Sequence, residues 1–382
     1  MTKELNKKQT LGRFDIVGEI AVDSKVFAIG SKGKNNQAWI SNVFNPRVDG
    51  VNGASMFVRM QDGYDEVKGK TLYLKTVNDE SMEIKFGDRF NPILVEKVNE
   101  RSFVKVFTKR VEKINEESGN KFMAWEEPQK FLTVFDAINF LQTVMPLASK
   151  HKVRMTGDVR YSTYNGKLQR NFELKNFYIL TNNEEEGKEM PLGFNFTQNI
   201  IVMKDAVKKD RFESEGVATI DTKLYVRKAK DQYEILDLPL TVRATEDNKD
   251  TYRKMLEKYF TVDGDTVRRV NVEGMFQVGY VSGNIDENDL PQNALELIED
   301  GFYSKEEVLK MFLKKERVDE TLLRRPIVKM SEGIPTGIDK SDEDYTMEDI
   351  QAAMKEVSTE ETIKIGESSI STDSLLDELS GL

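Results

Sequence analysis

The stretch that decides our fold prediction runs from His151 to Phe172 and reads HKVRMTGDVRYSTYNGKLQRNF. From Val153 to Arg160, apolar residues alternate with polar or charged ones. This period of two predicts a strand with one buried and one solvated face. Gly157 lies inside the strand, where glycine is typical of a bulge or of the close approach of another backbone. Asn165-Gly166 tolerates positive φ and a second apolar run follows, so the stretch predicts a β-hairpin.

The same order of elements recurs further along the chain. A helix-length apolar segment, Phe135–Ser149, precedes the first hairpin, and a predicted helix, Thr251–Phe260, precedes the strand Val267–Val281. Gly274 lies inside that second strand, 117 residues after Gly157. This spacing is close to the size of one small domain, so the sequence indicates two copies of one architecture.

Short predicted strands fill most of the remaining chain up to residue 244. Clusters of Gly, Asn and Asp separate them, which is typical of a barrel or a sandwich. The predicted strands are Phe14–Val22, Val26–Ile29, Ala38–Val43, Ser55–Met60, Thr71–Val77, Ser81–Phe86, Arg101–Thr108, Phe172–Leu180, Ile200–Met203, Val217–Arg227 and Leu238–Ala244.

The charge of the chain is unevenly distributed. The formal net charge is −10, yet 14 acidic residues and only three lysines lie from Ser331 to Leu382. The rest of the chain carries 53 basic and 52 acidic residues and is close to neutral. The sequence therefore predicts a near-neutral folded body followed by an acidic tail, which cannot bury a core of its own.

Few residue types suited to catalysis are present. Cys is absent and His151 is the single histidine, so thiolate chemistry and Cys/His zinc sites are excluded. No paired-acid motif on a predicted strand indicates a metal site, and we expect neither a cofactor nor enzymatic activity. The N-terminus has no apolar signal region, and no run of residues reaches the roughly 20 apolar residues of a membrane helix. We therefore expect a cytoplasmic protein without a membrane contact.

Several predicted strands place aromatic and basic side chains on one face. An exposed ring between two cations suits single-stranded nucleic acid, because the ring stacks on a base while the cations contact phosphates. We predict nucleic-acid contacts from the strand and hairpin residues Phe57, Arg59, Tyr73, Lys75, Phe103, Lys105, Phe107, Arg154, Arg160, Tyr161, Tyr164, Lys167, Arg170, Phe172, Lys223, Tyr225, Arg227, Arg268 and Arg269.

The two glycine-containing strands and the acidic tail carry a resemblance. Val270-Asn271-Val272-Glu273-Gly274, the earlier copy Lys152–Val159 and the tail resemble single-stranded DNA-binding proteins of bacteriophage type, which are built from oligonucleotide-binding (OB) folds. The chain departs from the bacterial members in lacking a terminal Pro-Phe pair and in being longer than one domain. The resemblance implies cooperative coating of DNA. It also implies a tail that recruits replication proteins and competes with DNA for a basic cleft.

Taken with this resemblance, the sequence predicts a mainly β chain of tandem OB-like barrels with a few helices and a flexible acidic tail. The expected segments are an OB-like domain at 1–112, a linker and helix at 113–150, a second OB-like domain at 151–290, a small helical segment at 291–330 and the tail at 331–382. The expected function is sequence-independent binding of single-stranded DNA in replication or recombination, in the host cytoplasm if the chain is phage-encoded. Partner proteins would bind the tail residues Asp373, Leu375, Leu376, Asp377, Glu378, Leu379 and Leu382.

Two alternatives remain open at this point. A virion structural protein with β-sandwich domains would share the predicted strands, the absence of Cys and the Asn/Gly-rich turns. A metal-dependent nuclease or an accessory replication factor would use some of the many carboxylates. The virion protein would not need rings and cations on the same strand faces, whereas the nuclease is distinguished by cleavage of single strands with Mg²⁺ or Mn²⁺.

Overall fold

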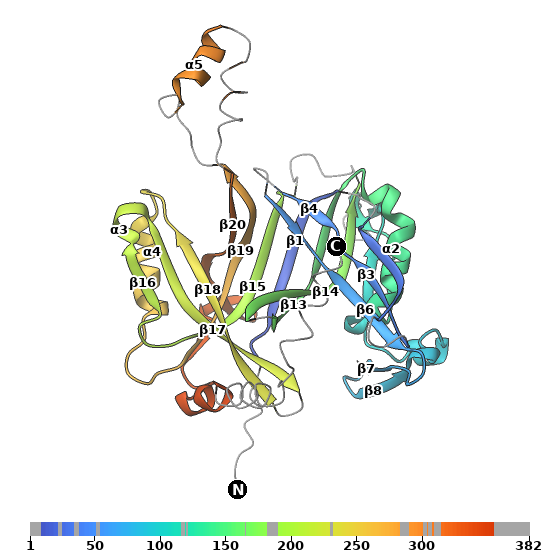
Figure 1. Cartoon of the computed structure of the whole chain (residues 1–382). Coiled ribbons are helices and arrows are strands. Elements are labelled where there is room, and N and C mark those ends of the chain that lie inside the picture. The colour runs from blue at the N-terminus through green and yellow to red at the C-terminus, as the bar shows by residue number, and fades with distance from the viewer. Residues whose placement is uncertain are drawn as a thin grey trace, which may run out of the picture.

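The structure is a computed structural model that describes residues 9–21, 25–33, 38–50, 54–115, 119, 121–164, 166–181, 190–229, 232–282, 290–300, 304, 308 and 315–354. The chain is mainly β, as the sequence predicts (Figure 1). Within these residues, no helix combines the length and the apolar character needed to cross a bilayer.

The first half of the chain contains short strands, one long helix and the predicted hairpin. Its elements are β1 (Gly12–Ala21), β2 (Phe27–Lys32), β3 (Trp39–Phe44), β4 (Arg47–Asp49), β5 (Ser55–Phe57), β6 (Met60–Asp65), β7 (Thr71–Lys75), β8 (Ser81–Lys85), η2 (Phe86–Asp88), α1 (Pro92–Val95), η3 (Glu100–Ser102), β9 (Val104–Phe107), β10 (Arg110–Ile114), β11 (Lys121–Trp125), β12 (Gln129–Phe131), α2 (Val134–Ala148), β13 (Lys152–Tyr164) and β14 (Lys167–Leu180).

The second half contains longer strands. Its elements are β15 (Gly193–Val202), β16 (Val207–Arg211), α3 (Phe212–Glu215), β17 (Val217–Ala229), β18 (Gln232–Arg243), α4 (Lys249–Met255), the π-helical turn η4 (Leu256–Phe260), β19 (Arg268–Ser282), α5 (Gln292–Glu299), β20 (Lys315–Pro326), β21 (Val328–Ser331), β22 (Ile334–Ile338) and β23 (Lys340–Ser341). Residues 347–354 form a last helix.

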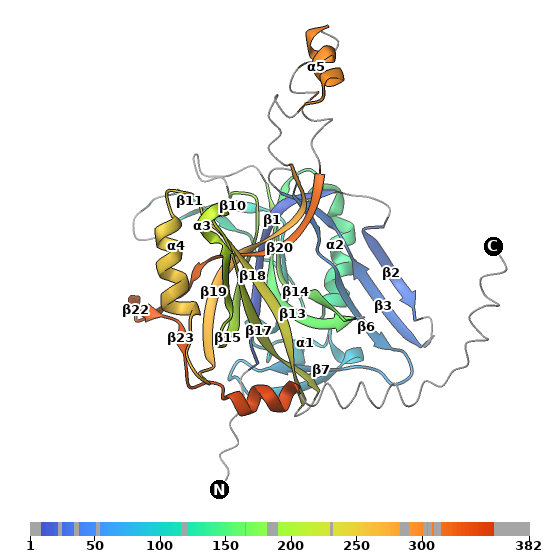
Figure 2. The ribbon, with the colours of Figure 1, turned by 60° about the vertical axis from the view of Figure 1, so that its left-hand side comes forward.

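The second half closes a five-stranded barrel. β15 pairs with β17, β17 with β18, β18 in parallel with β20, β20 with β19, and β19 pairs back with β15. Three consecutive strands with a fourth beside the first form a Greek key, and β20 completes the ring. α4 and η4 connect β18 to β19. Figures 1 and 2 show α5 standing apart from the sheets, beyond the ends of β19 and β20.

β1 joins the two halves into one sheet. It pairs with β13 along one edge and with β15 along the other. The buried rings of Phe14, Phe172, Phe276 and Phe196 continue across this junction, with successive ring centroids 5.1, 6.1 and 4.8 Å apart. β13 and β14 belong to the predicted second domain, yet they lie on the side of β1 that faces away from the barrel. The segments before and after the boundary predicted at residue 150 therefore share one sheet and one core.

The two glycine strands adopt the same local arrangement, as their sequence pattern indicates. Gly157 pairs with Phe14, and Gly274 pairs with Phe196. Each strand has a register shift at its glycine. A Cβ atom would lie 2.0 Å from the carbonyl oxygen of Glu173 at one site and of Leu322 at the other. Both positions need glycine because another backbone approaches closely.

The structure corrects two predictions about the C-terminal part. Lys315–Pro326, which was predicted to lie in a small helical segment, forms β20 of the barrel. The predicted tail does not begin at residue 331, because the segment up to residue 354 forms β22, β23 and a helix. Tyr345, Ile350 and Ala353 of this segment are buried in a common cluster. The predicted partner-binding residues from Asp373 to Leu382 lie outside the described residues.

Candidate nucleic-acid interface

Four of the predicted stacking rings are part of the core. Phe103, Tyr161, Phe172 and Tyr225 are each at most 6% exposed. The prediction that they stack on bases is therefore wrong for the folded chain. Tyr161 and Phe172 lie on the buried sides of β13 and β14, and Tyr225 lies in a run of β17 that is buried on both faces. A pattern within one strand does not reveal the second element that covers Tyr225.

Tyr225 shows what covers such a ring. It stacks on Tyr233 with centroids 4.8 Å apart, and the ring of Tyr345 lies at 5.3 Å. Tyr345 belongs to residues 339–354, which we call the strap because they lie across the end of the barrel. Ile350 and Ala353 of the strap complete the same buried cluster.

The strap also neutralises two predicted phosphate-binding arginines. Arg268 Nε donates to Asp342 Oδ1 at 2.6 Å, and Arg268 Nη2 donates to Oδ2 at 3.0 Å. Arg269 donates to Asp339 at 3.1 Å and forms an ion pair with Asp344. The hydrogen bonds from Arg268 lower the pKa of Asp342 below its ordinary value. The acidic strap thus satisfies both guanidinium groups.

Most other predicted cations have acidic partners. In every pair except Lys223 with Asp237, the closest nitrogen and oxygen atoms lie 2.6 to 2.9 Å apart. The pairs are Lys105 with Glu100, Arg154 with Asp15, Arg160 with Glu173, Arg170 with Asp319, and Lys223 with Asp237. Arg154 and Arg170 pair with acids 139 and 149 residues away, so one strand's pattern does not show these partners.

The remaining predicted residues have mixed surroundings. Phe107 is half-buried and stacks face to face on Tyr178, with centroids 4.5 Å apart. Arg59 is exposed and donates to the side chain of Gln61. Lys167 and Arg227 are exposed, and the side chain of Tyr164 lies outside the described residues.

Two predicted rings are largely exposed and available to a ligand. Phe57 is 59% exposed at the end of β5, and Tyr73 is 76% exposed on β7. β7 and β8 form a two-stranded sheet whose outer face carries Tyr73 with Lys75 and, on the facing strand, Lys85. Tyr73 is thus an exposed ring with Lys75 and Lys85 on either side along the sheet, and the exposed carboxylate of Glu83 lies directly opposite it.

A groove of about 560 Å³ adjoins this sheet and was not predicted. We call it the basic groove; its four cations outnumber its two acids, Asp65 and Glu66, and its rings and cations are Tyr64, Lys68, Lys70, Lys85, Phe86 and Arg89. Tyr64 and Phe86 stack with their centroids 4.3 Å apart. Lys85 belongs both to the groove and to the outer face beside Tyr73, so the two surfaces are continuous. The missed signal in the sequence is the pair of lysines around Gly69 together with Lys85-Phe86.

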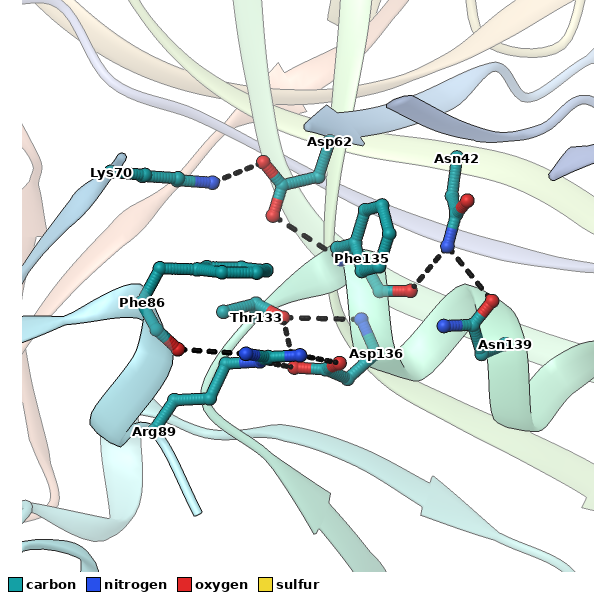
Figure 3. A network of polar contacts seen from close by, with 9 residues as sticks. All are labelled: Asn42, Asp62, Lys70, Phe86, Arg89, Thr133, Phe135, Asp136 and Asn139. Carbon is teal, nitrogen blue, oxygen red and sulfur yellow. Dashed lines mark hydrogen bonds and ion pairs between the residues drawn. The ribbon is translucent and has the colours of Figure 1, made fainter. Parts of the chain in front are cut away.

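Buried polar contacts fix one wall of the basic groove (Figure 3). The guanidinium of Arg89 lies 3.7 Å from the centroid of Phe86 and donates to Asp136 at 2.7 and 3.1 Å. A third bond, 2.7 Å long, joins Arg89 to the carbonyl oxygen of Phe86. Asp136 also accepts from the hydroxyl of Thr133, which caps the N-terminus of α2. Arg89 therefore holds Phe86 in place, and Asp136 neutralises its guanidinium, so it is poorly suited to pair with a ligand.

A second set of contacts anchors the groove to β3 and β6 (Figure 3). Asp62 forms an ion pair with Lys70 and accepts from the backbone N–H of Phe135 at 3.2 Å. Asn42 is fully buried and donates to the carbonyl oxygen of Phe135 and to Asn139 Oδ1, at 3.1 and 2.8 Å. Because each buried polar group has a partner, the N-terminus of α2 is rigidly connected to the groove.

Lys68 and Lys85 differ from the other two cations of the groove. Both are exposed, and neither forms an ion pair with any residue in the described part of the chain. Phe86 is buried against Tyr64 and Arg89, so Tyr73 is the ring that is open to a base, and the ammonium groups of Lys68 and Lys85 beside it are suited to phosphate contacts.

Comparison with models of known protein families and with the sequences of curated proteins finds no match for this chain. Over the described ranges, no group of three or more His, Cys, Asp or Glu side chains is placed to hold a metal ion.

Proposed function

We propose that this chain binds single-stranded DNA without sequence preference, and that the bases stack on Tyr73 beside the basic groove. Lys68, Lys75 and Lys85 would contact phosphates. The observation that carries the proposal is the continuous surface on which the exposed ring of Tyr73 lies between Lys75 and Lys85 and adjoins the basic groove. Stacking on an exposed ring and backbone contacts with lysine do not depend on the base.

The architecture supports the same proposal. A five-stranded Greek-key barrel is the architecture of the OB fold, which binds oligonucleotides in many proteins. The barrel from β15 to β20 has this strand order, and the Phe–Gly pair of its first and fourth strands recurs between β1 and β13. We therefore propose two OB-like units that share one core, acting in replication or recombination. The acidic residues from Asp373 to Leu382 would recruit partner proteins.

Fluorescence anisotropy with labelled oligo-dT tests the proposal. We expect the chain to prefer single strands to duplex DNA. Tyr73→Ala should weaken oligo-dT binding roughly 5- to 150-fold, which corresponds to about 1–3 kcal/mol for one stacked base. Tyr73→Phe keeps the ring and should bind within about twofold of the original chain. Equal affinity of Tyr73→Ala and the original chain would contradict the proposed interface.

A further inference from the structure

A second groove lies between the two halves of the molecule. It has a volume of about 520 Å³, within the range of about 300–1,000 Å³ that is typical of small-ligand sites. The exposed ring of Phe57 forms part of one side, and Leu168, Pro239 and Val278 add apolar surface. An open ring facing apolar walls provides a place for one flat aromatic ligand.

The cation of this groove is already engaged. Arg170 donates to Asp319 Oδ1 at 2.9 Å and to the hydroxyl of Thr321 at 3.2 Å, and its guanidinium lies 4.8 Å from the centroid of Phe276. It is therefore held between the two halves and is poorly placed to receive a phosphate. This is a clear difference from the basic groove, where Lys68 and Lys85 have no acidic partner among the described residues.

Hydrogen-bond acceptors dominate the polar lining instead. Asp237, Asp319 and Glu320 contribute three carboxylates, against the single guanidinium of Arg170 in the lining, and Glu320 already accepts from Arg243 at both oxygens. Asp237 and Asp319 remain well exposed and each uses one oxygen, Oδ1, for its ion pair. Because a carboxylate accepts at both oxygens, the second oxygen of each can receive a further N–H donor. The groove favours a flat ring with amino groups and disfavours a phosphate.

We propose that this groove, the inter-barrel groove, binds one unstacked nucleobase that carries an exocyclic amino group, as cytosine and adenine do. The base would stack on Phe57 and donate its amino group to Asp237 or Asp319. Thymine presents a carbonyl oxygen and a methyl group at the same edge, so it lacks the donor. The inference rests on the proposed function and extends it, because it adds a base preference at one position to binding that is otherwise independent of sequence.

Paired titrations with oligo-dC and oligo-dT test this inference. We expect the original chain to bind oligo-dC at least about fivefold more tightly than oligo-dT, the lower end of one good base contact. Phe57→Ala should remove this preference and leave oligo-dT affinity unchanged, whereas Phe57→Trp should retain it. Asp237→Ala should reduce the preference, and Asp221→Ala, at an exposed position of β17 outside the groove, should not.

The outcomes separate this inference from the proposed function. Equal affinity of the original chain for oligo-dC and oligo-dT, or a Phe57→Ala variant that keeps the preference, would refute the inter-barrel groove as a base site. The proposed function would stand, because oligo-dT would still bind. Failure of the original chain to bind either oligonucleotide would refute both.

Discussion

Two surfaces of this molecule contain the same residue types and differ in what covers them. At the end of the barrel, Tyr225, Arg268 and Arg269 are buried or paired by the strap. In the first half, Tyr73 is exposed and Lys68 and Lys85 have no acidic partner among the described residues. The comparison shows that rings and cations on a strand are available to a ligand only if no other segment satisfies them first.

The largest expected effect is the loss of stability when the buried ring of Tyr225 is removed. Tyr225→Ala should lower the free energy of unfolding by about 3–5 kcal/mol, because a large buried ring is replaced by a cavity. Tyr73→Ala, at an exposed position, should change it by less than about 0.5 kcal/mol. Urea unfolding of both variants measures the difference. Equal stability losses would mean that the strap does not bury Tyr225 in solution.

The next effect concerns the rigid wall of the basic groove. Asp136→Ala leaves Arg89 as a buried, unpaired cation and should cost about 3 kcal/mol or more in unfolding free energy. The control is Asp49→Ala, which breaks the exposed pair with Arg47 and should cost at most about 1 kcal/mol. Similar losses in urea unfolding would argue against a buried anchor at Asp136.

A smaller effect should appear in the salt dependence of DNA binding. Lys68→Gln with Lys85→Gln removes two proposed phosphate contacts, so the slope of log affinity against log salt should fall in magnitude by about 1.4. Lys204→Gln with Lys254→Gln changes two exposed lysines of the second half and should leave the slope unchanged. If both double variants change the slope equally, the charge effect is general and does not belong to the groove.

The smallest expected effect is the response of the strap to acid. The pKa of Asp342 is lowered in the folded chain by hydrogen bonds from Arg268, so the carboxylate stabilises the strap above its ordinary pKa of 3.8. This contribution is lost as the pH falls through the folded-state pKa. It should be at most about 1 kcal/mol, because the pair is partly exposed. The ring resonances of Tyr345 should shift in this acid range and shift less in Asp342→Asn; identical titrations would contradict the assignment.

Local features were the most predictable part of the fold. Period-two patterns predicted the main strands, and Asn165-Gly166 predicted the hairpin between β13 and β14. Gly157 was correctly predicted to lie at a bulge or close backbone approach, and Gly274 repeats that arrangement. The cap at the start of the last helix was also predictable. Thr346 and Asp349 exchange hydrogen bonds of 3.0 and 3.2 Å, the reciprocal pattern of a capping box.

The site was less predictable because burial depends on contacts between distant segments. The sequence Lys223–Arg227 predicts a solvated strand face. In the structure Tyr345, more than 100 residues later in the chain, packs against Tyr225 on that face. Arg154 reads as a phosphate ligand, yet Asp15 of β1 satisfies it at 2.6 and 2.8 Å. Composition placed the acidic residues in a tail and could not show that the strap folds onto the barrel.

Photo-crosslinking with an oligo-dT that carries bromodeoxyuridine tests the central claim most directly, because it reports which rings contact the bases. We expect adducts at Tyr73 and at Tyr64 of the basic groove, and none at Tyr225, Tyr233 or Tyr345 under the strap. Adducts at Tyr225 or Tyr233 without any at Tyr73 would show that DNA displaces the strap, and would contradict the proposed interface.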